Sequence, residues 1–253
     1  MNDLQEIASA VKARDTRAVA QAISLVEERS AEGPELLKLL EGGARPPVIG
    51  VTGAPGVGKS TLVDGMLSHY RRAGRTVAVI AVDPSSPITG GAVLGDRVRM
   101  HRHYTDPGVF IRSMATRGAY GGLAPATRDA VTILAAAGYD LVLVETVGVG
   151  QSEVEVMHLA DIVLLVLVPG MGDAIQTLKA GIMEIADIFV LNKSDHDGAS
   201  SLEQQVKDFL RLSPGRERET PVLRTVAATG EGIRDLCDAV DQEWRREPCT
   251  SGK

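Results

Sequence analysis

One segment of the sequence has the composition and spacing of a phosphate-binding loop. Residues 53–61 read Gly-Ala-Pro-Gly-Val-Gly-Lys-Ser-Thr, match the pattern G-x-x-x-x-G-K-S, and follow a short apolar run. The glycines permit a tight turn in which successive backbone N–H groups point into one concavity and bind phosphate oxygens. Lys59 adds a positive charge for the β- and γ-phosphates, and the Ser60 hydroxyl is placed to ligate Mg²⁺. We therefore predict a nucleotide site made of Gly53, Ala54, Pro55, Gly56, Val57, Gly58, Lys59, Ser60 and Thr61.

A second loop, 192–195, carries the motif N-K-x-D and predicts which base is bound. The Asp195 carboxylate can accept two hydrogen bonds from N1–H and the exocyclic amine of guanine, whereas adenine presents an unprotonated nitrogen there. The wrong base would leave a desolvated charge unpaired, so we predict guanine specificity. We expect Lys193 to lay its aliphatic stem over the base and Asn192 to tie the loops together. A third loop should close over the base with backbone N–H groups, from Ala227, Ala228 and Thr229.

Carboxylates follow two further apolar runs and suit a hard cation that prefers oxygen ligands. Asp83 comes after the run 77–82, and Glu145 comes after 141–144, where a D-x-x-G switch has an aspartate. Asp96 follows a glycine-bearing loop and is the third candidate. We predict that Ser60, Asp83, Asp96 and Glu145 form the Mg²⁺ site, and that Lys59, Glu145 and Asp96 take part in catalysis.

The residue after the expected switch glycine indicates slow hydrolysis. Ras-like enzymes place a glutamine directly after this glycine to orient the attacking water. Here Val149 follows Gly148, and Gln151 comes two residues later still. We expect hydrolysis to be slow unless a partner or a rearrangement supplies the missing group.

These loops need a scaffold that brings them to one edge, and the apolar pattern predicts one. Continuous rather than alternating apolar runs indicate strands buried on both faces, hence a mostly parallel sheet flanked by helices in an α/β P-loop NTPase fold. Ligands of such sheets bind beyond the carboxyl ends of the strands. We predict strands at Val48–Thr52, 77–82, 109–111, 141–145, 162–168, Ile188–Leu191 and 222–226, and helices at Lys59–Arg72, 124–137, 173–180, 201–212 and Ile233–Arg246.

The first 45 residues read as an addition to this fold. Their apolar positions predict one amphipathic helix over 4–28 and a shorter helix over 34–41. A Gly- and Pro-rich stretch, 42–47, then breaks helical structure. We divide the chain into an N-terminal helical extension, residues 1–45, and a P-loop GTPase domain, residues 46–253.

Composition excludes several classes of protein. With 33 acidic and 27 basic side chains the net charge is −6, and only 3% of residues are aromatic, which argues against nucleic-acid binding. Cys237 and Cys249 form no metal or disulfide pattern. The first ten residues lack an apolar segment, and the longest apolar run, 162–169, is too short to cross a bilayer. We expect no membrane anchor and a cytoplasmic location.

Three longer runs resemble the MeaB/ArgK/MMAA family of SIMIBI-class P-loop GTPases. They are 83–100 with D-P-S-S-P and G-G-A-V-L-G-D-R, 111–118 with I-R-S-M-A-T-R-G, and 145–153 with E-T-V-G-V-G-Q-S-E. The similarity extends from about residue 36 to 235. It implies GTP/GDP and Mg²⁺ as cofactors and an adenosylcobalamin-dependent acyl-CoA mutase as partner, whose B12 loading and protection such chaperones control. The residues at matching positions in the metal and switch network are Ser60, Asp83, Asp96 and Glu145.

The resemblance also implies a third switch that signals to the mutase, in residues 169–179. The residues assigned to partner signalling are Gln151, Asp173, Gln176 and Lys179. One departure concerns the C-terminus, since standalone members continue into a dimerisation arm and this sequence ends at Lys253. We therefore expect that any homodimer uses another surface.

Two alternatives stay open. A SIMIBI metal-insertion GTPase would be expected to show Cys- or His-rich segments, and a kinase or ATPase coupled to amino-acid transport would be expected to bind ATP. The basic cluster Arg97, Arg99, His101, Arg102 and His103 fits either a solvated helix face or signalling linked to a partner or to the nucleotide.

Overall fold

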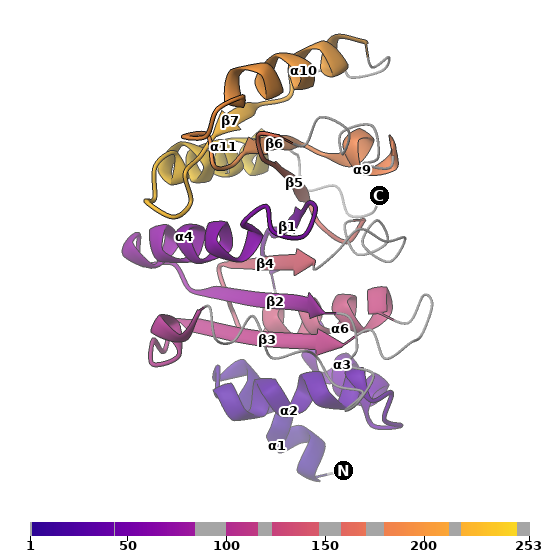
Figure 1. Cartoon of the computed structure of the whole chain (residues 1–253). Coiled ribbons are helices and arrows are strands. Elements are labelled where there is room, and N and C mark those ends of the chain that lie inside the picture. The colour runs from indigo at the N-terminus through magenta and orange to yellow at the C-terminus, as the bar shows by residue number, and fades with distance from the viewer. Residues whose placement is uncertain are drawn as a thin grey trace, which may run out of the picture.

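A single parallel sheet forms the centre of the molecule (Figure 1). The computed structural model describes residues 2–42, 44–83, 100–115, 123–146, 158–170, 180–212 and 219–246. Within these residues the sheet has seven strands in the order β3-β2-β4-β1-β5-β6-β7, and each neighbouring pair is parallel. The strands are β1 Val48–Thr52, β2 Val77–Asp83, β3 Val109–Ala115, β4 Leu141–Thr146, β5 Ile162–Leu167, β6 Ile188–Leu191 and β7 Val222–Arg224. This confirms the predicted α/β fold.

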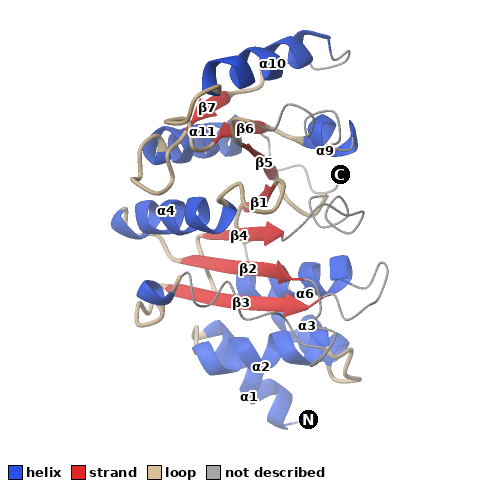
Figure 2. Ribbon diagram, in the orientation of Figure 1, coloured by secondary structure: helices blue, strands red, loops and turns tan. Residues whose placement is uncertain are grey.

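Helices cover both faces of the sheet (Figure 2). They are α1 Asn2–Lys12, α2 Thr16–Glu27, α3 Gly33–Leu40, α4 Lys59–Arg72, the 3-10 helix η1 His101–His103, α6 Leu123–Ala136, α9 Ala180–Ile185, α10 Ala199–Leu212 and α11 Ile233–Arg246. Helices α4 and α11 pack on one face, whereas α1, α2, α3 and α6 pack on the other. Helices α9 and α10 cover β5 and β6 on the same side as α6.

The two faces follow from the alternation of side chains along each strand. In β4, Leu141 and Leu143 belong to the apolar cluster of α4 and α11, whereas Val142 and Val144 belong to the cluster of the N-terminal helices and α6. All six residues of β4 are buried. Residues 141–144 of this strand are continuously apolar because both of its faces are covered.

The N-terminal region corrects one prediction. Instead of a single helix over 4–28, the chain forms α1 and α2, separated at residues 13–15. Arg14 has a left-handed φ of 60°, and the Asp15 carboxylate accepts a hydrogen bond of 2.7 Å from the Ala18 backbone N–H as the N-cap of α2. This cap begins a second helix, which lets both helices turn apolar faces to the same core.

The extension shares its core with the sheet. Leu4, Val11 and Val19 lie in one cluster with Phe110 of β3 and Val142 of β4. The division at residue 45 remains a prediction, but its two parts are joined by apolar packing.

Some element ends differ from prediction. Strand β3 continues beyond residue 111 to Ala115 because it pairs with β2 along its whole length. Strand β7 ends at Arg224 rather than at residue 226, and Val226 forms an isolated antiparallel bridge with Glu231. Residues 173–179 of one predicted helix lie outside the described residues, and α9 begins at Ala180. In the described part of the chain, no helix is both long and apolar enough to span a membrane.

Candidate functional site

The predicted phosphate loop connects β1 to α4. Residues 53–58 form the loop, and Lys59, Ser60 and Thr61 form the first turn of the helix. Lys59 is buried, and its Nζ donates to the carbonyl oxygens of Gly53 at 2.7 Å and Ala54 at 3.0 Å. The ammonium group therefore lies inside the curve of the loop, where a phosphate-binding cation is needed.

Two glycines of this loop are required by close approaches. Gly53 has a φ of 144°, and a Cβ there would lie 2.3 Å from the carbonyl oxygen of Val166 in β5. Gly58 has a φ of 95°, and a Cβ there would lie 2.5 Å from the side-chain nitrogen of Asn192. Other residue types would have to displace the neighbouring strand or the N-K-x-D loop.

Ser60 and Glu145 meet at the carboxyl end of the central strands. The Ser60 hydroxyl donates to Glu145 Oε1 at 2.7 Å, and both side chains are almost fully buried. Strands β1 and β4 are neighbours in the sheet, so two residues far apart in sequence become adjacent. A hydroxyl and a carboxylate oxygen side by side suit a small hard cation such as Mg²⁺.

The remaining metal and switch residues are only partly placed. Asp83 is the last residue of β2, the strand next to β4, and its backbone pairs with Ala115 of β3. Several predicted residues lie outside the described residues: Asp96, Gln151, Asp173, Gln176 and Lys179.

Asn192 joins three loops at the opposite end of the site. Its Nδ2 donates to the Val57 carbonyl at 2.8 Å, and its Oδ1 accepts from Thr225 Oγ1 at 3.1 Å and from the Ala227 backbone N–H at 3.0 Å. The side chain is 2% exposed. The expected contacts between the loops are confirmed, and they hold the phosphate loop and the candidate base loops in a fixed relation.

Lys193 and Asp195 have different surroundings from Asn192. Lys193 adopts a left-handed φ of 55°, and its Nζ donates to the Gly56 carbonyl at 3.0 Å, so its stem crosses the phosphate loop. Asp195 is exposed and lines a shallow pocket with Pro169 and Gly170, which follow β5. The carboxylate is accessible to a ligand.

In the loop after β7, two of the three backbone N–H groups predicted to bind the base already donate to protein acceptors. Ala227 N–H is used by Asn192, and Thr229 N–H donates to the Val226 carbonyl at 3.0 Å. Among the described contacts, the Ala228 N–H donates to no protein acceptor. Of the three predicted residues, Ala228 is therefore the best placed to donate to a base.

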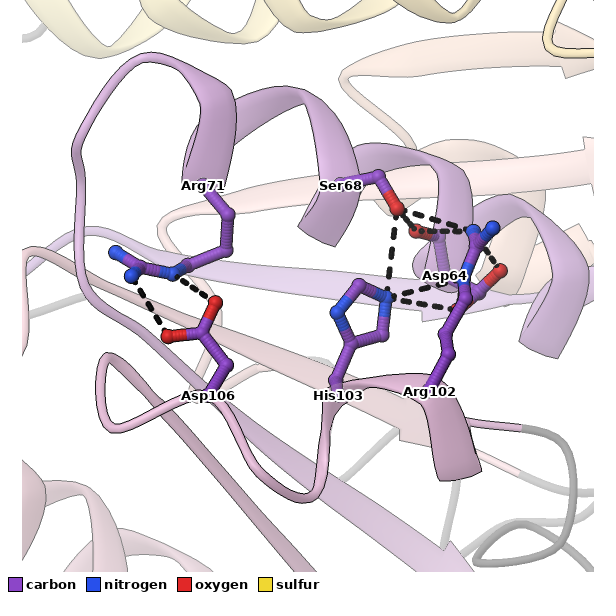
Figure 3. Close-up of polar contacts among 6 residues, drawn as sticks. All are labelled: Asp64, Ser68, Arg71, Arg102, His103 and Asp106. Atoms are coloured by element: carbon purple, nitrogen blue, oxygen red, sulfur yellow. Dashed lines mark hydrogen bonds and ion pairs between the residues drawn. The ribbon is translucent and has the colours of Figure 1, made fainter.

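Sequence reasoning missed a polar cluster on α4 (Figure 3). His103 is 8% exposed, and its Nε2 lies 3.0 Å from Asp64 Oδ1 and 3.4 Å from Ser68 Oγ. Arg102 pairs with both carboxylate oxygens of the same aspartate. Of the two alternatives for this basic cluster, a solvated face does not describe the buried His103, whereas Arg102 stays 55% exposed. Both side chains are bound by Asp64 and Ser68, which are spaced four residues apart on one side of α4.

The environment of this cluster shifts two pKa values. Burial lowers the pKa of His103 below its usual 6.5, against the opposing effect of Asp64. Further along α4, Arg71 donates to both oxygens of Asp106, at 2.9 and 2.7 Å, and these bonds lower the pKa of the Asp106 carboxyl. Residues 102–106 are thus fixed to α4 at two points.

The chain matches a family model over most of its length. The model describes methylmalonyl-CoA mutase-associated GTPase MeaB and matches residues 19–252. A protein of Pyrococcus abyssi named as a putative GTPase is 50% identical over 246 residues, which cover 94% of this chain and 75% of that protein. The mitochondrial methylmalonic aciduria type A homolog of Caenorhabditis elegans is 33% identical over 266 residues, covering 96% of this chain and 66% of that protein.

A solved structure shows the same architecture. The crystal structure of a protein named LAO/AO transport system kinase superposes with a TM-score of 0.77 at 30% sequence identity, over 96% of this chain and 75% of the other. The loops described above thus occur on a scaffold shared with this structure, in a chain whose relatives are named GTPases. The chain is a GTPase and belongs to the methylmalonyl-CoA mutase-associated GTPase family, MeaB.

Proposed function

We propose that this GTPase is a chaperone that controls the loading of adenosylcobalamin into a B12-dependent acyl-CoA mutase and protects the loaded enzyme. The observation that carries the proposal is the match of residues 19–252 to a family described as mutase-associated. The relation to a methylmalonic aciduria type A homolog supports it. The client would be a cytoplasmic mutase.

The nucleotide would lie across the loops at the carboxyl edge. In this proposal, the backbone N–H groups of 53–61 and the Lys59 ammonium bind the phosphates. Asp195 and the Ala228 N–H read the guanine edge, while Lys193 covers one face of the base and Asn192 fixes the loops. The exposed carboxylate of Asp195 and the buried bonds of Asn192 support these separate roles.

Mg²⁺ would be held at the Ser60–Glu145 end of the site, with Asp83 and Asp96 as further oxygen donors. When bound, it would neutralise charge that develops on the transferred phosphoryl group. Glu145, in the strand next to β1, would orient Ser60, because the 2.7 Å hydrogen bond between them fixes the Ser60 hydroxyl. Signalling to the mutase would run through Gln151, Asp173, Gln176 and Lys179.

Base recognition is tested by Asp195→Asn. An asparagine offers one donor and one acceptor, which suits the N1–H and 2-carbonyl edge of xanthine instead of guanine. We expect GTP affinity to fall on the order of 10²–10⁴-fold, because two hydrogen bonds to a charged group are lost, and xanthosine triphosphate to be hydrolysed instead. Asp197→Asn, an exposed carboxylate in the same loop, is the matched control. Unchanged base preference in Asp195→Asn would contradict this assignment.

The chaperone role needs a second experiment with a purified mutase. Transfer of adenosylcobalamin to the mutase should change when GTP replaces GDP in the presence of this protein, and Lys59→Ala should remove the difference. Transfer that ignores the nucleotide would contradict the proposal. ATP binding as tight as GTP binding would instead favour a kinase or ATPase coupled to amino-acid transport, in line with the name of the transport-kinase relative.

A further inference from the structure

A small pocket lies beside the proposed nucleotide loops. It has a volume of about 280 Å³ and is bordered by Thr61, Asp64 and Ser68 of α4, by Arg102, and by the loop 227–230. Thr61 belongs to the phosphate loop motif, and 227–229 is the candidate base loop. The pocket therefore touches the element proposed to bind phosphates and an element proposed to bind the base.

The ribose is the part of a nucleotide that joins the phosphates to the base. A ligand with its phosphates on 53–61 and its base against Asp195 and Ala228 must pass its sugar between these elements. The pocket borders both of them, and its wall carries a carboxylate, a hydroxyl and a guanidinium group. These are hydrogen-bonding partners for hydroxyl groups.

Arg102 is held in a fixed orientation at this wall (Figure 3). Its Nε donates to Asp64 Oδ1 at 2.9 Å, and its Nη2 contacts Asp64 Oδ2 and donates to Ser68 Oγ at 3.0 Å. Among the described residues, Nη1 has no acceptor. The side chain is 55% exposed, so a positioned donor remains accessible.

The second attachment of this segment keeps the arginine near the pocket. Asp106 accepts two hydrogen bonds from Arg71, and its Oδ1 also accepts from the Gly108 N–H at 2.8 Å. With both ends of 102–106 bound to α4, Arg102 loses little further conformational freedom when it contacts a ligand.

We propose that Arg102 contacts the ribose of the bound guanosine nucleotide through Nη1, and that Asp64 is the residue that positions it. This proposal rests on the proposed nucleotide site. It assigns to the segment after β2 a contact that phosphate-loop and base-loop motifs do not include.

The test compares GDP with 2′,3′-dideoxy-GDP by calorimetry on wild type, Arg102→Met and Arg75→Met. In wild type, loss of the ribose hydroxyls should weaken binding about tenfold, the scale of one hydrogen bond to a charged donor. Arg102→Met should bind GDP about tenfold more weakly and no longer distinguish the two ligands. Arg75→Met, a matched arginine that pairs with Asp241 and does not border the pocket, should retain the discrimination.

Asp64→Asn provides an independent variant, because the amide keeps the shape but accepts fewer hydrogen bonds from Arg102. It should show reduced discrimination, with an unfolding temperature close to wild type. Discrimination in Arg102→Met equal to that of wild type would overturn the ribose contact while leaving the nucleotide site intact. Absence of GDP binding by wild type would overturn the nucleotide site itself, so the two failures are distinguishable.

Discussion

The two faces of the sheet are built from the same strands but differ in how their helices are attached. The face covered by α1, α2, α3 and α6 is joined to the sheet mostly by apolar side chains. Helix α4, on the other face, also begins at the phosphate loop and carries the polar pairs of Asp64 and Arg71. One face thus mainly stabilises the fold, whereas the other combines burial with contacts that position site residues.

Replacing one buried leucine on each face should give the largest change in stability and tests whether the two faces differ. Leu36 of α3 and Leu62 of α4 are both fully buried, and replacing either by alanine should lower the free energy of unfolding by about 2–5 kcal/mol. Only Leu62→Ala should also weaken GDP binding, because it lies one turn from Lys59 and Ser60. Chemical unfolding and calorimetry measure both quantities. Equal loss of GDP affinity in the two variants would remove the distinction between the faces.

Asn192→Ala should have a smaller effect on stability and a clear one on binding. It leaves the buried Val57 carbonyl without its partner, at a cost of about 1–3 kcal/mol, whereas the half-buried Ala227 N–H can bond to water instead. It also releases the base loops from the phosphate loop. Because the loops are no longer held together, the affinity for GDP, measured by calorimetry, should also fall.

The control for Asn192 is Arg14→Met, on the other face. Arg14 donates to the carbonyl oxygens of Ala137 and Gly138, so its loss should affect stability without changing the dissociation constant of GDP. Altered GDP binding in this variant would show that the N-terminal helices influence the site.

The pH dependence should give the smallest difference. The folded pKa of His103 lies below 6.5, so as the pH falls below that value the unfolded imidazole takes up a proton before the folded one. The free energy of unfolding should therefore decrease on acidification through this window, measured by urea titration between about pH 7.5 and 5.5. His103→Gln should flatten the change. Asp106 does not contribute to the change in this pH range, because the pKa of its carboxyl is lowered from the usual 3.8.

Much of the fold could be predicted because its strands are buried on both faces. Strands β1 and β6 and helices α4 and α11 have the predicted bounds, since each is an apolar or periodic run next to a recognisable loop. The motif residues Lys59, Ser60 and Asn192 are placed by those elements. The contact between Ser60 and Glu145 follows from the order of β1 and β4 in a parallel sheet.

The rest depended on one local cap and on contacts between distant segments. The break at Asp15 is a local capping signal that the apolar periodicity obscured. The polar residues at the end of β3 do not predict a strand. In the folded chain Arg112 is accommodated there because its guanidinium donates to Glu27 of α2 at 2.9 Å. Likewise, only the packed structure shows that Asp64 pairs with residues 102 and 103, because no spacing relates them in sequence.

The shared core of the extension and the sheet limits how this protein can be shortened. A chain trimmed to begin at residue 46 would keep every motif. However, Phe110 and Val142 would lose their apolar neighbours on the first helices and become exposed to solvent. Such a truncation should yield aggregating material rather than a minimal enzyme. Affinity tags and fusion partners are better attached ahead of Met1 than substituted for the first helices.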